Sequence, residues 1–213
     1  MPIVRDDPER PDPAFAQLYS RLGAATDLEP WLDWSREAAG EVLYLGVGAG
    51  RLAVPLMQAG VTVVGVDAHP GMLETLAVRV PAMELINSRI EDLDLDRRFE
   101  LVIAPSNILY TQQRLRGAAR HLLPGGRLGF ELTNPHWLHA GAQPGVRVIE
   151  LSHDRAWIEV DYDGGYTQQA AFDLVWPEQI EAWLVKARLR LISIRGRGER
   201  LEESSTFHVL AVR

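Results

Sequence analysis

Three closely spaced glycines and one downstream aspartate are the residues whose types and spacing point most directly to chemistry. Gly46, Gly48 and Gly50 follow an apolar run and precede an expected helix. Glycine lets the main chain approach a ligand closely, and a helix start presents free backbone N–H groups. Asp67 ends the next apolar run, where its carboxylate can accept hydrogen bonds from both hydroxyls of a ribose. These residues predict a backbone-lined site for a ribose-containing ligand.

The residue at position 51 indicates which kind of ligand such a loop binds. A nicotinamide-binding loop has the spacing Gly-x-Gly-x-x-Gly, in which the third glycine lets the helix pack tightly on the strand. Counting from Gly46 places Arg51 at that third position. The dinucleotide fingerprint is therefore absent, and a nicotinamide-dependent oxidoreductase is disfavoured.

Alternating strands and helices must position these residues. Apolar runs predict buried strands, and apolar residues at helical spacing predict the helices between them. The strands are expected at 42–45, 61–66, 84–87, 99–104 and 127–132. Repeated strand–helix units with nearly continuous apolar strands favour an α/β fold, a doubly wound and mostly parallel sheet with helices on both faces.

The last third of the chain follows a different pattern, in which apolar and polar residues alternate along short segments. Antiparallel strands are expected at 146–151, 156–162 and 166–176, and two closing strands at 189–194 and 206–212. Prolines and charges make residues 1–13 an expected flexible lead-in. The remaining residues, 14–213, are then a single domain that contains an antiparallel insertion at 146–176.

Three motifs occur in order along the first two thirds of the chain. They are VLYLGVGAGRLA at 42–53, VGVDAHPGML at 64–73 and LLPGGRL at 122–128. Together they resemble the class I methyltransferases that use S-adenosylmethionine, over about residues 19–132. The resemblance implies a Rossmann-like sheet of seven strands whose last strand runs antiparallel. It also implies S-adenosylmethionine as cofactor and a small-molecule acceptor, because residues 105–107 and 134–135 are similar to small-molecule members of the family.

The resemblance also implies roles for individual residues. Methyl transfer from a sulfonium is an in-line displacement, so the protein mainly supplies alignment and a dry pocket. Cofactor contacts are implied for Gly46, Gly48, Gly50, Tyr44, Asp67, Ala68 and Asn107. The first candidate for a catalytic base is His136, which follows the fifth strand, and the second is Tyr19 on the N-terminal helix.

Two positions depart from the family pattern. Tyr44 stands where the family usually has an acidic residue near the methionine end of the cofactor. Arg89 stands where an acidic residue commonly reaches the adenine amine, although a shift of register brings Glu91 or Asp92 there. Each missing charge-assisted hydrogen bond costs about 1.5–3 kcal/mol of binding free energy. The alternative function is therefore a non-catalytic or repurposed member of the fold that acts as a binding module.

Composition and charge exclude other classes of function. Acidic residues outnumber basic ones by 29 to 22, the wrong sign for a protein that neutralises phosphates, so no nucleic-acid partner is expected. The chain has no cysteine, which excludes disulfides and thiolate chemistry and fits the cytoplasm. No apolar run approaches the ~18 residues of a membrane span, so no membrane partner is expected. No metal site is expected, because His136 and His139 lack acidic neighbours.

The insertion at 146–176 has two expected uses. Its aromatic residues can line an apolar pocket, and its strands can pair with those of a second copy in a homodimer. The aromatic residues in question are Trp157, Tyr162, Tyr166, Phe172 and Trp176. The sequence leaves both uses open.

Overall fold

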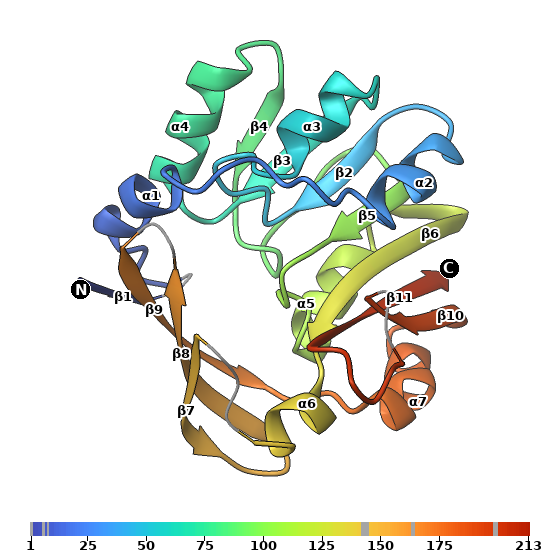
Figure 1. Cartoon of the computed structure of the whole chain (residues 1–213). Helices are drawn as coiled ribbons and strands as arrows, with labels where there is room; N and C mark the ends of the chain where they lie inside the picture. Colours follow the sequence, from blue (N-terminus) through green and yellow to red (C-terminus); the bar gives the residue numbers. More distant parts are fainter. Residues whose placement is uncertain (1, 6, 8, 142–144, 163–164, 198–199) are drawn as a thin grey trace.

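Seven strands form a large sheet, and four more form a small one (Figure 1). The computed structural model describes residues 2–5, 7, 9–141, 145–162, 165–197 and 200–213. The large sheet has the order β10-β11-β6-β5-β2-β3-β4. Its strands are β2 (Val42–Leu45), β3 (Val63–Asp67), β4 (Glu84–Asn87), β5 (Phe99–Ala104), β6 (Leu122–Thr133), β10 (Arg190–Gly196) and β11 (Thr206–Val212).

The directions of these strands confirm the predicted fold class. Strand β2 pairs in parallel with β3 and β5, and the pairs β3–β4 and β5–β6 are parallel as well. The last strand, β11, runs antiparallel to both β6 and β10. The carboxyl ends of the parallel strands therefore meet at one edge of the sheet, which is where ligands bind in open α/β sheets.

Helices cover both faces of the large sheet because successive strand residues point to opposite faces. Leu43 and Leu45 belong to one apolar cluster, and Val42 and Tyr44 belong to the other. The first cluster includes residues of α5 (Gln112–Ala119) and α7 (Ile180–Val185), and the second those of α2 (Trp31–Arg36), α3 (Ala53–Gln58) and α4 (Pro70–Arg79). None of the described helices is long and apolar enough to cross a membrane.

The small sheet contains the predicted antiparallel insertion and one strand that the sequence analysis missed. Strands β7 (Val146–Leu151), β8 (Arg155–Tyr162) and β9 (Tyr166–Asp173) pair antiparallel. The fourth strand, β1 (Ile3–Arg5), pairs in parallel with β9. The expected lead-in at 1–13 is therefore partly built into the fold, although residues 1, 6 and 8 lie outside the described part of the chain.

A short N-terminal helix, α1 (Pro13–Tyr19), connects the two sheets. Asp12 caps this helix, since its side chain accepts a hydrogen bond from the backbone N–H of Ala14. Phe15 packs in a cluster that includes Val4 of β1 and Met72 of α4. This packing holds α1 beside the glycine loop and the edge of the small sheet (Figure 1).

Strand β6 begins earlier than the sequence predicted. The strand was expected to begin at residue 127, but it begins at Leu122, which pairs with Phe99 of β5. A register shift follows between Phe99 and Leu101, and Gly125 in this segment has a φ of 78°. Glycine tolerates that left-handed backbone, so the chain bends here without leaving the sheet.

Candidate active site

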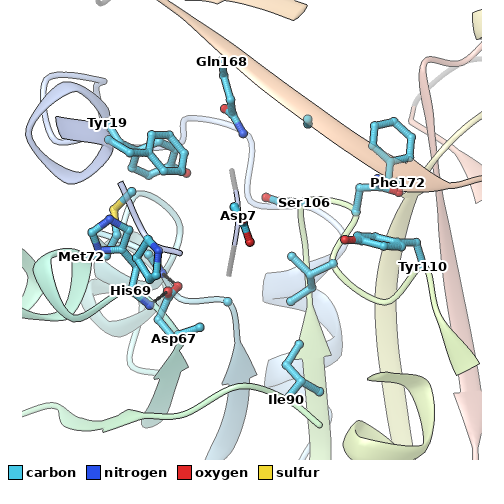
Figure 2. Close-up of a pocket in the computed structure, with 18 of the residues that line it drawn as sticks. Asp7, Tyr19, Asp67, His69, Met72, Ile90, Ser106, Tyr110, Gln168 and Phe172 are labelled. Carbon is cyan, nitrogen blue, oxygen red and sulfur yellow. Dashed lines mark hydrogen bonds between the residues drawn. The ribbon is translucent and has the colours of Figure 1, made fainter. Parts of the chain in front are cut away.

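A cavity of about 420 Å³ lies between the carboxyl ends of the large sheet and the inner face of the small sheet (Figure 2). The large sheet contributes Gly46, Asp67 and Glu131 to its lining. The small sheet contributes Ile158 and Phe172. The cavity thus lies at the edge where an α/β sheet binds its ligand, and the second sheet closes it from the opposite side.

The glycine loop after β2 forms part of the cavity wall through its backbone. Gly46 and Gly48 line the cavity and have φ values of 69° and 55°. A Cβ atom on Gly46 would lie 2.7 Å from Cδ1 of Ile108 and would sit on a left-handed backbone, so a side chain here would shift Ile108 and strain the loop. Gly50 does not line the cavity as described, and a Cβ there would collide with Leu76 of α4. Gly50 therefore permits the packing of α4, whereas Gly46 and Gly48 face the ligand space.

Asp67 at the end of β3 faces the cavity beside this loop (Figure 2). Its Oδ2 accepts a hydrogen bond from the backbone N–H of Gly48 at 2.7 Å, and its Oδ1 accepts one from that of His69 at 2.8 Å. Burial raises the pKa of the Asp67 carboxyl, and these two hydrogen bonds oppose that effect. Each oxygen keeps a further lone pair, so the fixed carboxylate can still accept two hydroxyl donors. Ala68 lines the cavity next to it.

Tyr44 lies beneath the cavity and is absent from its described lining. Its side chain is buried in the apolar cluster that includes Trp31 and Trp34. Burial raises the pKa of the Tyr44 hydroxyl well above its usual value, and the neighbouring Tyr19 and Glu131 raise it further. A neutral hydroxyl thus replaces the acidic side chain of the family pattern, and its expected contact with the cofactor is not seen in the cavity lining.

The second departure from the family pattern, Arg89, lies at the edge of the cavity beyond β4. Arg89 forms ion pairs with Glu9 and Glu91 at 3.4 and 3.7 Å. Glu91 also lines the cavity, but Nε of Arg114 contacts its Oε1 at 2.9 Å. Burial alone would raise the pKa of Glu91, but the hydrogen bond and charge of Arg114, a backbone hydrogen bond and the charge of Arg89 together outweigh burial and lower that pKa. Asp92 is exposed and absent from the described lining, so of the two acids only Glu91 faces the cavity.

Asn107 fixes the loop that follows β5. Its Oδ1 accepts a hydrogen bond from the backbone N–H of Thr133 at 2.9 Å, which ties the ends of β5 and β6 together. Ser106 and Asn107 have φ values of 66° and 59°, a left-handed backbone that is unusual for two successive residues other than glycine. Both residues line the cavity, so this strained turn lies at the site itself.

Tyr19 at the end of α1 lines the cavity from the N-terminal side, as predicted for a residue of the site. The guanidinium of Arg51 lies 5.7 Å from the centre of its ring. Arg5, Asp7 and Pro11 also line the cavity, although the sequence predicts only a flexible lead-in for their segment. The segment reaches the cavity because β1 joins the small sheet.

His136, the first candidate for a catalytic base, lies away from the cavity and is absent from its described lining. It belongs to α6 (Pro135–His139), and its Nε2 lies 2.7 Å from Oε1 of Glu178. Its ring packs against Trp176, with the ring centres 4.9 Å apart. The expectation fails because Asn134 caps a short helix directly after β6, and that helix turns His136 towards Glu178.

The small sheet supplies an apolar wall opposite the glycine loop. Its inner face contributes Ile158, Val160, Ala170 and Phe172, and Tyr110 faces Phe172 with the ring centres 6.1 Å apart. Of the aromatic residues predicted for this wall, Tyr162 and Phe172 line the cavity. Tyr166 is buried against Phe15 of α1, Trp157 is exposed, and Trp176 donates to the carbonyl of His153, so these three are not part of the described lining.

Glu131 of β6 is, besides Asp7, an acidic residue of the cavity for which no role was predicted from the sequence. It follows Phe130 and precedes Leu132, both of which are buried. A single carboxylate within an apolar strand is costly to bury unless it is paired, so its position alone was a signal of a site. Its partners are His208 and Thr206 of β11.

Comparison with known proteins gives the same family as the motifs. A methyltransferase domain family model matches residues 42–126. A cypemycin N-terminal methyltransferase of a Streptomyces species is 31% identical over 153 residues, which are 67% of this chain and 62% of the relative. This chain thus spans less than two thirds of that relative's length. An uncharacterised methyltransferase of Synechocystis is 31% identical over 149 residues, 63% of this chain and 68% of the relative.

A solved structure shows the same fold over nearly the whole chain. It is an S-adenosylmethionine-dependent methyltransferase from Clostridium acetobutylicum, with a TM-score of 0.71 at 17% sequence identity. The match covers 93% of this chain and 97% of that structure. The sheet order, the glycine loop and these relatives agree, and the chain therefore belongs to the class I S-adenosylmethionine-dependent methyltransferase family.

Proposed function

We propose that this protein transfers the methyl group of S-adenosylmethionine to a small molecule. The observation that carries the proposal is Asp67, whose carboxylate is fixed by two backbone N–H groups at the cavity wall. The bound cofactor supplies a methyl group on a positively charged sulfur. Gly46 and Gly48 present their backbone to the cavity, and Asp67 provides acceptors for the ribose hydroxyls of the cofactor.

The cavity divides into two parts that suit two reactants. We call the wall formed by Gly46, Gly48, Asp67, Ala68 and Asn107 the cofactor half. We call the wall formed by Tyr110, Glu131, Ile158, Val160, Ala170 and Phe172 the acceptor half. Apolar side chains exclude water from the second half, which favours a displacement between two aligned reactants. Tyr19 lies beside the glycine loop, where we propose that it helps to position the reacting groups.

The alternative of a non-catalytic binding module is not favoured. It was motivated by Tyr44 and Arg89, the two departures from the family pattern. Two glycines with a left-handed backbone at the cavity wall and a preorganised Asp67 are retained, which supports a working cofactor site. Glu131 also adds a carboxylate to the cavity wall.

Calorimetric titration of the ligand-free protein tests this function. We expect micromolar binding of S-adenosylmethionine and S-adenosylhomocysteine, and no binding of NADH as the control. The absence of binding by both sulfur compounds would overturn the proposal. It would favour the binding-module alternative and direct attention to protein partners.

Pairing of two copies through residues 146–176 stays a prediction. In favour of it, β7 is at the edge of the small sheet as described. Val148, Ile149 and Trp157 of the same sheet are exposed. Light scattering after gel filtration is expected to give twice the mass of the chain, and a monomer mass would contradict the pairing.

The cytoplasm is the proposed compartment, because the chain has no cysteine.

A further inference from the structure

Among the described residues, four carboxylates line the cavity: Asp7, Asp67, Glu91 and Glu131. Asp67 is held by two backbone N–H groups in the cofactor half, and Glu91 pairs with an arginine. Asp7 belongs to the N-terminal segment, where it accepts a hydrogen bond from a neighbouring backbone N–H. Glu131 differs from these three because it lies on β6, in the acceptor half. Its environment therefore bears on what the acceptor is.

The carboxylate of Glu131 is fixed from one side by the neighbouring strand. Glu131 pairs in register with His208 of β11. Nε2 of His208 lies 3.1 Å from Oε2 of Glu131, and Oγ1 of Thr206 donates to the same oxygen at 3.4 Å. Neither of these contacts uses Oε1. The Glu131 side chain is 15% exposed, and the residue lines the cavity. The pair thus holds the carboxylate in place without covering it.

His208 is held in turn by two tryptophans. It is 3% exposed, and its ring meets those of Trp31 and Trp34 edge-on, with centres 5.3 and 6.5 Å apart. Gly129 of β6 lets Trp34 approach, since a Cβ there would collide with the indole. A neutral imidazole can donate from Nε2 and leave the negative charge on the carboxylate. This arrangement positions Glu131 as a rigid anion beside apolar walls.

We propose that Glu131 recognises the acceptor and that the acceptor is an amine attached to an apolar body. This proposal rests on the proposed function. An ammonium group adds the attraction between opposite charges to its hydrogen bond with a carboxylate, and a neutral hydroxyl lacks that attraction. The apolar body packs against Ile158 and Phe172 of the small sheet. His208 acts as a positioning residue, because it touches the carboxylate and not the cavity.

Glu131 also has the chemistry to prepare such an acceptor. An ammonium nitrogen has no free electron pair, so it must lose a proton before it attacks. One N–H bond breaks, its electron pair stays on nitrogen, and the proton moves to the Glu131 carboxylate, which becomes a neutral acid. The nitrogen then has the lone pair that methyl transfer requires. The negative charge of Glu131 thus serves both recognition and proton removal.

The test uses the full chain loaded with S-adenosylhomocysteine and measures thermal shifts with matched ligands. We expect 2-phenylethylamine to raise the melting temperature and 2-phenylethanol to have no effect. Glu131→Gln keeps the shape and removes the charge, so it is expected to weaken amine binding at least tenfold. Its affinity for S-adenosylhomocysteine is expected to stay within twofold of wild type. Glu178→Gln is the matched control, since Glu178 also pairs with a histidine but lies outside the described cavity lining.

The role of His208 has a separate readout. His208→Phe removes the donor to Glu131, and we expect it to raise the KM for the amine several-fold and to lower kcat, because Glu131 both binds the amine and takes its proton. His208→Gln keeps an N–H donor and is expected to restore most of that loss, which a purely structural role would not predict.

Equal shifts with the amine and the alcohol, or no shift with the amine, would overturn the proposal. An unchanged response in Glu131→Gln would do the same. Loss of S-adenosylhomocysteine binding in that variant would assign Glu131 to the cofactor instead. The failure of wild type to bind S-adenosylhomocysteine would be a different result, because it would contradict the proposed function itself.

Discussion

The two halves of the cavity are built in different ways. The cofactor half is formed by loops at the carboxyl ends of neighbouring parallel strands, and its contacts come largely from the backbone and from Asp67. The acceptor half combines β6 with β8 and β9 of the second sheet, and its contacts come from side chains. Backbone contacts depend on glycine and tolerate few changes, whereas side-chain contacts change with each substitution. The difference explains how one fold can keep a cofactor while its acceptor varies.

The largest effect should follow from adding a methyl group to the glycine loop of the cofactor half. Gly46→Ala places a Cβ atom 2.7 Å from Cδ1 of Ile108 and forces a side chain onto a backbone with a φ of 69°. We expect titration with S-adenosylhomocysteine to show at least a hundredfold loss of affinity. Gly60→Ala is the matched control, because Gly60 has a φ of 91° but open space around it. Similar losses in both variants would show that backbone strain, and not the ligand space, is responsible.

Removal of the charge at Asp67 should have the next largest effect. Asp67→Asn keeps the size of the side chain but weakens the acceptors for the ribose, so cofactor affinity is expected to fall tenfold to a hundredfold, or about 1.5–3 kcal/mol. Because burial raises the pKa of Asp67, wild-type affinity should also decline as the pH falls through that raised pKa. The decline should be absent in Asp67→Asn. Titrations across the acid range check both points, and an unchanged affinity at neutral pH would remove Asp67 from the site.

The acceptor half should respond to a different substitution and leave the cofactor half unchanged. Phe172→Ala removes part of the apolar wall, and we expect about a tenfold higher KM for the amine acceptor, since a buried aromatic ring contributes a few kcal/mol at most. The affinity for S-adenosylhomocysteine should not change. Trp157→Ala on the exposed face of the same sheet is the control, measured in the same assays. Loss of cofactor affinity in Phe172→Ala would break the division into two halves.

The smallest effect concerns the free energy of unfolding and the ion pair between Glu91 and Arg114. Glu91→Gln breaks the ion pair with Arg114, and we expect a loss of about 1 kcal/mol in the free energy of unfolding at neutral pH. The pKa of Glu91 is lower in the folded protein than the usual 4.5, so its contribution is complete above that value and is lost as the pH falls through the lowered pKa. Denaturant unfolding of both proteins at several pH values checks this. A constant difference at all pH values would contradict the assignment.

The cofactor half could be predicted from the sequence because its determinants are local. The loop at Gly46 and Gly48 and the acid at Asp67 each follow one strand, and the strand–helix pattern places those strand ends together. The parallel strands and the antiparallel insertion followed from apolar periodicity, whereas the antiparallel last strand was implied by the family resemblance. Gly50 was grouped with the ligand glycines because spacing alone does not distinguish a contact with a ligand from one with Leu76.

The acceptor half could not be predicted in the same way because it depends on contacts between distant segments. His136 was favoured for its position after β6, but the cap at Asn134 turned it towards Glu178. Glu131 acquires its partner only when β11 pairs with β6, about 77 residues later in the chain. The N-terminal residues reach the cavity through a parallel pairing of three residues with β9, which no sequence pattern indicates.

The central claim is that one cavity holds a cofactor on the large sheet and an acceptor against the small sheet. A crystal structure of the protein with S-adenosylhomocysteine tests it most directly. We expect the ribose hydroxyls on the Asp67 carboxylate, the ligand backbone along Gly46 and Gly48, and the sulfur directed towards the acceptor half. A ligand bound elsewhere, or one whose sulfur points away from Glu131 and Phe172, would contradict the account.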